Sequence, residues 1–177
     1  MEATCIATAP VRADRTEKGR HAHMGMSVTI SAATEDDAEQ ILKLQYLCYT
    51  GEAERYGDYT IEPLTQSLDG LRAELARGRV LVARLGDEVV GSVRGAVDAD
   101  GTASIAGLIV HPRMQRHGLG GRLLTAVEDS LAAELGARRF RLTTGLRQEG
   151  NLRRYRKWGY AKVDGELVKA AGVLAGT

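Results

Sequence analysis

A glycine-rich turn at residues 115–121, QRHGLGG, holds the residue types in this sequence that could bind a charged ligand. It lies between an apolar stretch with strand character, ASIAGLIVHP, and a helical one, RLLTAVEDSLAAEL. Glycine is unfavourable at a helix start unless the bare backbone is needed there. In a strand–turn–helix arrangement, backbone N–H groups point into one concavity, and the first N–H groups of the helix are unpaired. The turn therefore predicts a site for a phosphate or pyrophosphate group.

The alternative for this stretch is a plain tight turn. A side chain at Gly118 or Gly120 would hold an anion away from the backbone, and Arg116 and Arg122 could add positive charge at the rim. The dinucleotide motif GxGxxG is not met, because Leu123 stands where its third glycine belongs. The GxxxxGK(S/T) loop of nucleotide triphosphatases is absent as well. The order of strand, turn and helix favours an anion site of another kind.

Hydrophobic periodicity predicts the elements that position this turn. Alternating, β-branched stretches predict strands at 28–34, 79–85, 88–97, 102–110 and 138–144, with a closing hairpin within 159–170. Helical spacing predicts helices at 34–49, 63–78, 119–135 and within 151–160, with Thr34 as the N-cap of the first. Residues 51–63 are interpreted as a loop or a broken helix. Strands with inserted helices indicate one α/β domain built on a mixed sheet.

Composition limits the possible functions. The chain has 177 residues, enough for one domain, and 44% of them are hydrophobic. Its 24 basic and 23 acidic residues give a formal net charge of +1, which provides no reason to expect nucleic acid or a membrane as a partner. No apolar stretch approaches the roughly 20 residues of a membrane span. We expect a disordered tail at 1–25 without secretory character, a single domain at 26–177, and a cytoplasmic location.

Cysteine and histidine content gives no indication of a metal site or a disulfide framework. The two cysteines, Cys5 and Cys48, form no CxxC motif, so we expect two reduced thiols. His21 and His23 could bind a metal ion, but the tail offers them no third ligand. We therefore expect no metal.

Two motifs resemble those of a known family. The segment VHPRMQRHGLGGRLL resembles the acyl-CoA-binding segment of the GNAT superfamily of N-acyltransferases, whose motif Q/R-x-x-G-x-G/A is matched by residues 115–120. Downstream, NLRRYRKWGY is similar to the second signature of the family, an asparagine and a tyrosine on a short helix that ends in G-F/Y. The order of elements from Val28 to about Ala170 also fits, so the resemblance covers nearly all of the chain beyond the tail.

The resemblance implies a fold and a co-substrate. It implies a splayed, mostly antiparallel sheet of about seven strands flanked by about four helices, with acyl-CoA in the gap between the fourth and fifth strands. The anion at the turn would then be the pyrophosphate of acetyl-CoA. The residues implied to bind acetyl-CoA are Leu108, Ile109, Val110, Gln115, Arg116, His117, Gly118, Leu119, Gly120, Gly121 and Asn151.

The same resemblance implies that Tyr155 is the general acid. A phenol with a pKa near 10 is close to a thiol in acidity, so proton transfer to the departing sulfur of coenzyme A is feasible. Asn151 stands four residues earlier, on the same helical face, and could hydrogen-bond the pantetheine arm. Many family members carry this asparagine about seven residues before the tyrosine, where this chain has Gln148. A buried packing tyrosine is the alternative for Tyr155.

The general base has several candidates. Many relatives carry a glutamate on the fourth strand, whereas TASIAGLIV contains no acid. Glu52, Glu54, Asp58 and His111 are the possible substitutes, and a water chain or a partly deprotonated amine would need none of them. Four tyrosines lie in the region that borders the acceptor site in the family, and acids beside aromatic faces would suit a cationic amine. They are Tyr46, Tyr49, Tyr56 and Tyr59, of which the first two could equally belong to the core.

Basic residues also gather near the second motif. They could meet the 3′-phosphate of coenzyme A, although a solvated helix face is the commoner explanation for such a group. These residues are Arg147, Arg153, Arg154, Arg156 and Lys157.

The sequence thus predicts an acetyl-CoA-dependent N-acetyltransferase that acts by direct transfer in a ternary complex, with a small-molecule or protein amine as acceptor. The resemblance leaves a homodimer possible, because dimers are frequent in the family, but the sequence does not fix the oligomeric state. Cys48 is not expected to be an acyl-carrying nucleophile, since no histidine or acid is placed by sequence to activate it. The rival hypothesis is a non-catalytic acyl-CoA-binding sensor, which the missing acid on the fourth strand keeps open.

Overall fold

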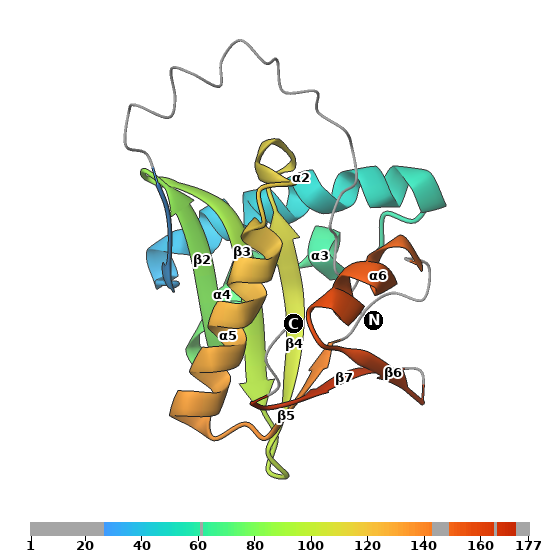
Figure 1. Cartoon of the computed structure of the whole chain (residues 1–177). Coiled ribbons are helices and arrows are strands. Elements are labelled where there is room, and N and C mark those ends of the chain that lie inside the picture. Colours follow the sequence, from blue (N-terminus) through green and yellow to red (C-terminus); the bar gives the residue numbers. More distant parts are fainter. Residues whose placement is uncertain (1–26, 61, 143–148, 165, 173–177) are drawn as a thin grey trace.

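The computed structural model describes residues 27–60, 62–142, 149–164 and 166–172 of the chain. These residues form a seven-stranded sheet in the order β1-β2-β3-β4-β5-β7-β6, with helices on both faces (Figure 1). Every neighbouring pair is antiparallel except β4 and β5, which are parallel. The mixed, mostly antiparallel sheet predicted from the sequence is confirmed.

The strands follow the predicted stretches closely. They are β1 Val28–Ala32, β2 Arg79–Leu85, β3 Glu88–Val97, β4 Thr102–Val110, β5 Arg139–Leu142, β6 Ala161–Val163 and β7 Glu166–Ala170. The helices are α2 Ala38–Tyr56, α3 Glu62–Thr65, α4 Leu68–Arg77, α5 Leu119–Leu135 and α6 Glu149–Lys157, with 3-10 turns at Glu35–Asp37 and Pro112–Met114.

Two helical stretches have bounds that differ from those predicted. α2 continues to Tyr56, into the stretch 51–63 that the sequence marks as a loop or a broken helix, because the sequence there offers helix-forming residues and Ala53 is buried. Gly57, with φ 65°, then ends the helix. The predicted helix at 63–78 is two helices, α3 and α4, because the side chain of Ser67 accepts a hydrogen bond from the backbone N–H of Gly70 at 3.0 Å and starts a new helix.

Alternate residues of the sheet build two cores. On one face, α5 packs Leu123, Leu124, Val127 and Leu131 onto the strands, and α2 and α4 pack on the other face. A Cβ atom at Gly91 would lie 2.8 Å from Leu123, and one at Gly95 would lie 2.6 Å from Leu131. Glycines at these positions of β3 therefore let α5 sit close to the sheet, which fixes where its N-terminus lies.

Two ion pairs join elements of the fold: one joins β7 to α5, and the other joins the start of α2 to β2. Lys169 of β7 lies 2.9 Å from Glu128 of α5, and both side chains are almost fully buried. Asp37, at the start of α2, accepts hydrogen bonds from both terminal nitrogens of Arg84 on β2, at 2.6 and 2.5 Å. The Asp37 carboxylate also accepts from the backbone N–H of Thr34, the predicted N-cap, at 2.7 Å. The start of α2 is thus held by a nearly buried carboxylate.

We expect Asp37→Asn to lower the free energy of unfolding by about 2 kcal/mol at pH 7, as the loss of hydrogen bonds to a charged group does. The hydrogen bonds from Arg84 are the main cause that lowers the pKa of Asp37. The wild type should keep this stabilisation above the ordinary carboxyl pKa of about 4 and lose it as pH falls through the lowered pKa. Urea unfolding between pH 7 and pH 2 measures both effects. The matched control is Asp36→Asn, an exposed acid in the same turn; an equal loss in the control would contradict the role of the pair.

Candidate functional site

Among the described residues, β4 is paired with its parallel neighbour β5 over only the first half of its length. It pairs with β5 only from Thr102 to Ile105 and then continues to Val110 without a strand on that side among the described residues. A bulge lies where the pairing stops, because Ala106 faces Arg94 and Ile109 faces Ser92, which leaves two residues of β4 opposite one residue of β3. The first of these two is Gly107, with φ 63°. On the β5 side, the second half of β4 therefore presents backbone groups that no strand of the described residues pairs.

The turn after β4 has an unusual backbone. Two of its residues are left-handed, Arg116 with φ 69° and Gly118 with φ 73°. A left-handed conformation costs a residue with a Cβ atom roughly 1–2 kcal/mol, and such residues concentrate at functional sites. α5 begins at Leu119 after Gly118, which has no side chain to cap the helix, and within the described residues no side-chain cap for its first N–H groups is found. This helix end is suited to an anion.

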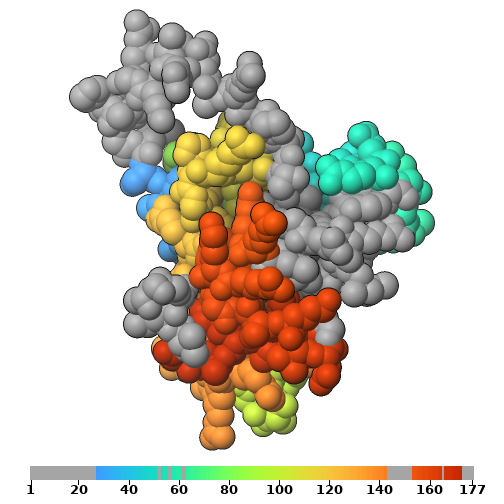
Figure 2. Space-filling view, turned by 45° about the vertical axis from the view of Figure 1, so that its right-hand side comes forward, coloured from blue at the N-terminus to red at the C-terminus, as the bar shows by residue number. Residues whose placement is uncertain are grey.

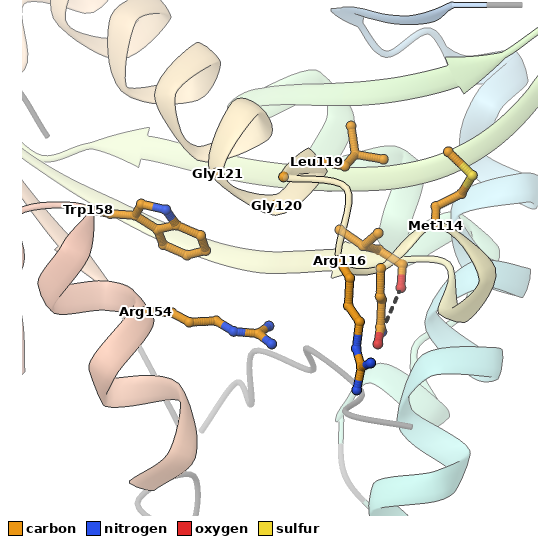
Figure 3. A pocket seen from close by; sticks show the side chains of 10 residues that line it. Met114, Arg116, Leu119, Gly120, Gly121, Arg154 and Trp158 are labelled. Atoms are coloured by element: carbon orange, nitrogen blue, oxygen red, sulfur yellow. Dashed lines mark hydrogen bonds between the residues drawn. The ribbon is translucent and has the colours of Figure 1, made fainter. Parts of the chain in front are cut away.

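A cavity of about 220 Å³ lies against the N-terminus of α5. In the space-filling view, the turn segment in yellow and α6 in orange face each other across a hollow (Figure 2). Figure 3 shows Arg154 of α6 and Trp158, just after α6, reaching toward the turn, and Arg116 extending from the turn itself. The cavity is lined by Val110, Met114, Gln115, Arg116, Gly118, Leu119, Gly120, Gly121, Arg154 and Trp158. Two arginines from different elements thus stand beside an uncapped helix end.

Most of the predicted binding residues meet at this cavity. Seven of them line it, and the exceptions are His117, Leu108, Ile109 and Asn151. His117 is exposed, and Leu108 and Ile109 are buried in the cores on opposite faces of the sheet. Asn151 lies on α6, but its side chain is outside the described residues.

Sequence reasoning did not single out Met114 or Trp158 as residues of this cavity. A Cβ atom at Gly121 would lie 3.0 Å from the indole nitrogen of Trp158, so the absence of a side chain there makes room for the indole. Trp158 is the one tryptophan of the chain, and it follows Tyr155 by three residues within the second motif. Its being the one tryptophan and its place in the second motif could have singled out Trp158 from the sequence.

Tyr155 contacts Trp158 from the core side of the cavity. Its side chain is fully buried in the core cluster that also contains Leu108 and Leu142, and its ring meets Trp158 edge to face with 5.6 Å between ring centroids. Leu108 belongs to the part of β4 beyond the pairing, and Leu142 is the last residue of β5. Tyr155 therefore belongs to the same core as the end of β5 and the part of β4 beyond that pairing.

The candidate bases lie in different surroundings. Glu54 and Asp58 are exposed, and the side chain of Glu52 is outside the described residues. Burial, followed by the charge of Arg113, lowers the pKa of His111. Its Nδ1 accepts from the backbone N–H of Arg113 at 3.2 Å, and the residue borders a separate hollow beside α2. Of these residues, Glu54, Asp58 and His111 do not line the cavity at α5.

The tyrosines of the predicted acceptor region differ in burial. Tyr49 is buried in the core, as one of the two interpretations had it, whereas Tyr46 is 56% exposed, so a core position for Tyr46 is wrong. Tyr46 and Tyr49 are three residues apart on α2, and only Tyr49 faces the sheet. Tyr59 is 57% exposed, and the side chain of Tyr56 is outside the described residues.

Cys48 lies beneath the end of β4. Its thiol donates to the backbone carbonyl of Val110 at 3.5 Å, and the side-chain amide of Gln115 donates to the same oxygen at 3.4 Å. Burial raises the pKa of the Cys48 thiol to about 12, so it is protonated at neutral pH. These contacts tie the end of β4 to α2 and to the turn.

Other possible sites are limited within the part of the chain that the structure describes. There, no three histidine, cysteine, aspartate or glutamate side chains gather as metal ligands would, and no helix has the length and apolarity needed to cross a membrane. The predictions for Cys5, His21, His23, Arg147 and Gln148 concern residues outside that part.

Gly118→Ala and Gly136→Ala form a matched pair at the two ends of α5. Both glycines are left-handed, with φ 73° and 69°, and a Cβ atom at either would meet no other atom within 4 Å. Each substitution should therefore cost roughly 1–2 kcal/mol of stability by thermal unfolding. Only Gly118 lines the cavity, so only its substitution should weaken coenzyme A binding by calorimetry, by about tenfold. Equal effects of the two variants on binding would contradict an anion site at this end.

Comparison with known proteins agrees with this geometry. Residues 38–160 match the model of the acetyltransferase (GNAT) family. No curated protein matches the chain in sequence. Among solved structures, the PaiA N-acetyltransferase of Thermoplasma acidophilum, in complex with coenzyme A, is 19% identical, with a TM-score of 0.68 over 82% of this chain and 99% of that one.

Two further structures share the fold. A GNAT-family acetyltransferase of Staphylococcus aureus Mu50 is 13% identical, with a TM-score of 0.70 over 82% of this chain and 99% of that one. The N-acetylglutamate synthase of Neisseria gonorrhoeae, complexed with coenzyme A and N-acetyl-glutamate, is 19% identical, with a TM-score of 0.64 over 83% of this chain and 36% of that one. The match of the family model over most of the chain shows that this protein belongs to the acetyltransferase (GNAT) family.

Proposed function

We propose that this protein is an acetyl-CoA-dependent N-acetyltransferase that transfers the acetyl group directly to an amine in a ternary complex. The observation that carries the proposal is the uncapped N-terminus of α5, preceded by two left-handed residues and opening on a cavity beside Arg116 and Arg154. Family membership and the coenzyme A in two similar structures support the choice of ligand.

The residues present fit a coenzyme A pyrophosphate. The N–H groups at the start of α5 would donate to its oxygens, and the guanidinium groups of Arg116 and Arg154 would balance its charge. Beyond Ile105, β4 has no strand partner on the β5 side among the described residues, so its backbone groups would pair with the amides of the pantetheine arm. Leu108, Ile109 and Val110 make up that backbone, and Asn151 would add a side-chain contact.

Tyr155 would supply the proton that the departing sulfur needs. Its phenol is buried in the core cluster that also contains Leu108 of β4 and Leu142 of β5, and the thioester would lie nearby. Water exclusion there would favour transfer of the phenolic proton to the thiolate, since two groups of similar acidity exchange a proton readily.

The acceptor is proposed to be a primary amine of a small molecule or a protein. β4 carries no acid, so the amine would arrive neutral or lose its proton to water. Proximity of amine and thioester in the ternary complex would then supply much of the rate enhancement. A cytoplasmic location and a homodimer remain expectations.

A sensor that binds acyl-CoA without turnover is the second candidate function. The missing acid on β4 is the observation that favours it. Tight acetyl-CoA binding without thiol release for any amine in a broad panel would establish the sensor and contradict the transferase.

Replacing Tyr155 by phenylalanine should lower kcat roughly 10²- to 10⁴-fold, the range of a general acid, and leave coenzyme A affinity nearly unchanged. The ring and its packing on Trp158 are preserved in this variant. Free-thiol release from acetyl-CoA with an amine panel measures the first effect, and calorimetry the second. Tyr160→Phe, which alters the second buried tyrosine of the same core cluster, is the matched control. Loss of turnover in Tyr160→Phe but not in Tyr155→Phe would show that Tyr155 is not the general acid and would point to Tyr160 instead.

Cys48→Ser should retain turnover, because serine can still donate to the carbonyl of Val110 and no acyl group passes through the thiol. With its pKa raised to about 12, Cys48 should also resist alkylation by iodoacetamide at pH 8 in the folded protein. Mass spectrometry of peptides after incubation with acetyl-CoA or iodoacetamide measures both. Acetylated Cys48, together with loss of turnover in a folded Cys48→Ser variant, would show a covalent mechanism instead.

A further inference from the structure

The indole of Trp158 separates two hollows at the start of α5. One is the cavity already described, and the other is an open groove of about 480 Å³ along the outer side of the helix. Gly118 and Gly121 also line both, so the two hollows meet around the helix N-terminus. A ligand held at that N-terminus could therefore continue into the groove.

The groove has the chemistry of a site for a flat ring with polar edges. Besides Trp158 and the two glycines, it is lined by Ile30, Arg122, Thr125, Ala126 and Asp129. An aromatic face and two aliphatic side chains suit a planar ring, whereas a hydroxyl and a carboxylate can pair with ring nitrogens and amino groups. Arg122 donates to the backbone carbonyl of Val28 at 3.2 Å, which places its charge at the rim between α5 and β1.

The position of Trp158 depends on the absence of a side chain at residue 121. A Cβ atom there would lie 3.0 Å from the indole nitrogen, whereas one at Gly120 would make an ordinary contact of 3.7 Å. The indole is held edge to face by Tyr155 at 5.6 Å and remains only partly buried. One part of the ring therefore packs against the core, and the rest is available to a ligand.

We propose that Trp158 is a binding residue whose indole stacks on the purine ring of the nucleotide end of acyl-CoA, seated in the groove along α5. This inference rests on the proposed function, because the pyrophosphate at the helix N-terminus joins the nucleotide to the pantetheine arm. Stacking on one aromatic face gives affinity for a base with little dependence on its hydrogen-bonding pattern. The groove thus provides the chain with a purine subsite separate from the cavity that holds the pyrophosphate.

The test compares ligands with and without the nucleotide. Trp158→Leu should weaken coenzyme A binding roughly 5- to 100-fold by calorimetry, the range expected for one stacked base, and leave 4′-phosphopantetheine binding nearly unchanged. Trp158→Phe, which keeps an aromatic face, should fall between the wild type and Trp158→Leu. An equal loss for both ligands in a folded Trp158→Leu variant would make Trp158 a packing residue and overturn the inference.

A second readout needs no variant. Because Trp158 is the one tryptophan in the chain, its fluorescence reports on the start of α5, where Trp158 lines both hollows. ADP should change the emission of the wild type saturably, and 4′-phosphopantetheine should change it less. Coenzyme A binding without any change in emission would overturn the inference but not the proposed function. Absence of coenzyme A binding to the wild type would overturn both.

Discussion

Among the residues that the structure describes, no side chain caps the N–H groups at the start of α5, and the neighbouring structure is arranged around that helix end. An uncapped helix N-terminus carries partial positive charge, and a bound anion satisfies it. Two glycines of β3 let α5 approach the sheet closely enough to fix where this end lies. The left-handed Arg116 then turns the chain into the helix at a cost in backbone energy that a plain connection would not require.

The early end of the β4–β5 pairing is the second constraint. The bulge at Gly107 follows the four residues of β4 that pair with β5, and the thiol of Cys48 and the amide of Gln115 then hold the carbonyl of Val110. The far strands need fastening of their own. The buried pair between Glu128 and Lys169 ties β7 to α5, although burial of Glu128 raises its pKa and so opposes the charged form. The end of β4 and the strand β7 beside β5 are thus both held by side-chain contacts.

Much of this arrangement is readable in the sequence, for identifiable reasons. Strands and the long helix follow from periodicity, and the anion site follows from glycines placed between a strand and a helix. The extension of α2 and the division of 63–78 could not be read there, because both depend on local capping by Gly57 and Ser67. Trp158 and the pair between Asp37 and Arg84 were missed because those contacts join residues distant in sequence. The role of Tyr155 as general acid and the pantetheine contacts of Asn151 and of residues 108–110 were implied by the family resemblance, not by periodicity or spacing.

The central claim is that the start of α5 binds the pyrophosphate of acetyl-CoA, and amide chemical shifts measure it most directly. In a ¹⁵N-labelled sample titrated with acetyl-CoA, the account predicts that the largest changes fall on the N–H groups of residues 118–122, with saturation at one equivalent. Because a hydrogen bond to an anion shifts an amide proton strongly, the effect should be visible without knowledge of the acceptor amine. Saturable binding that leaves these amides unchanged, or no binding at all, would contradict the account.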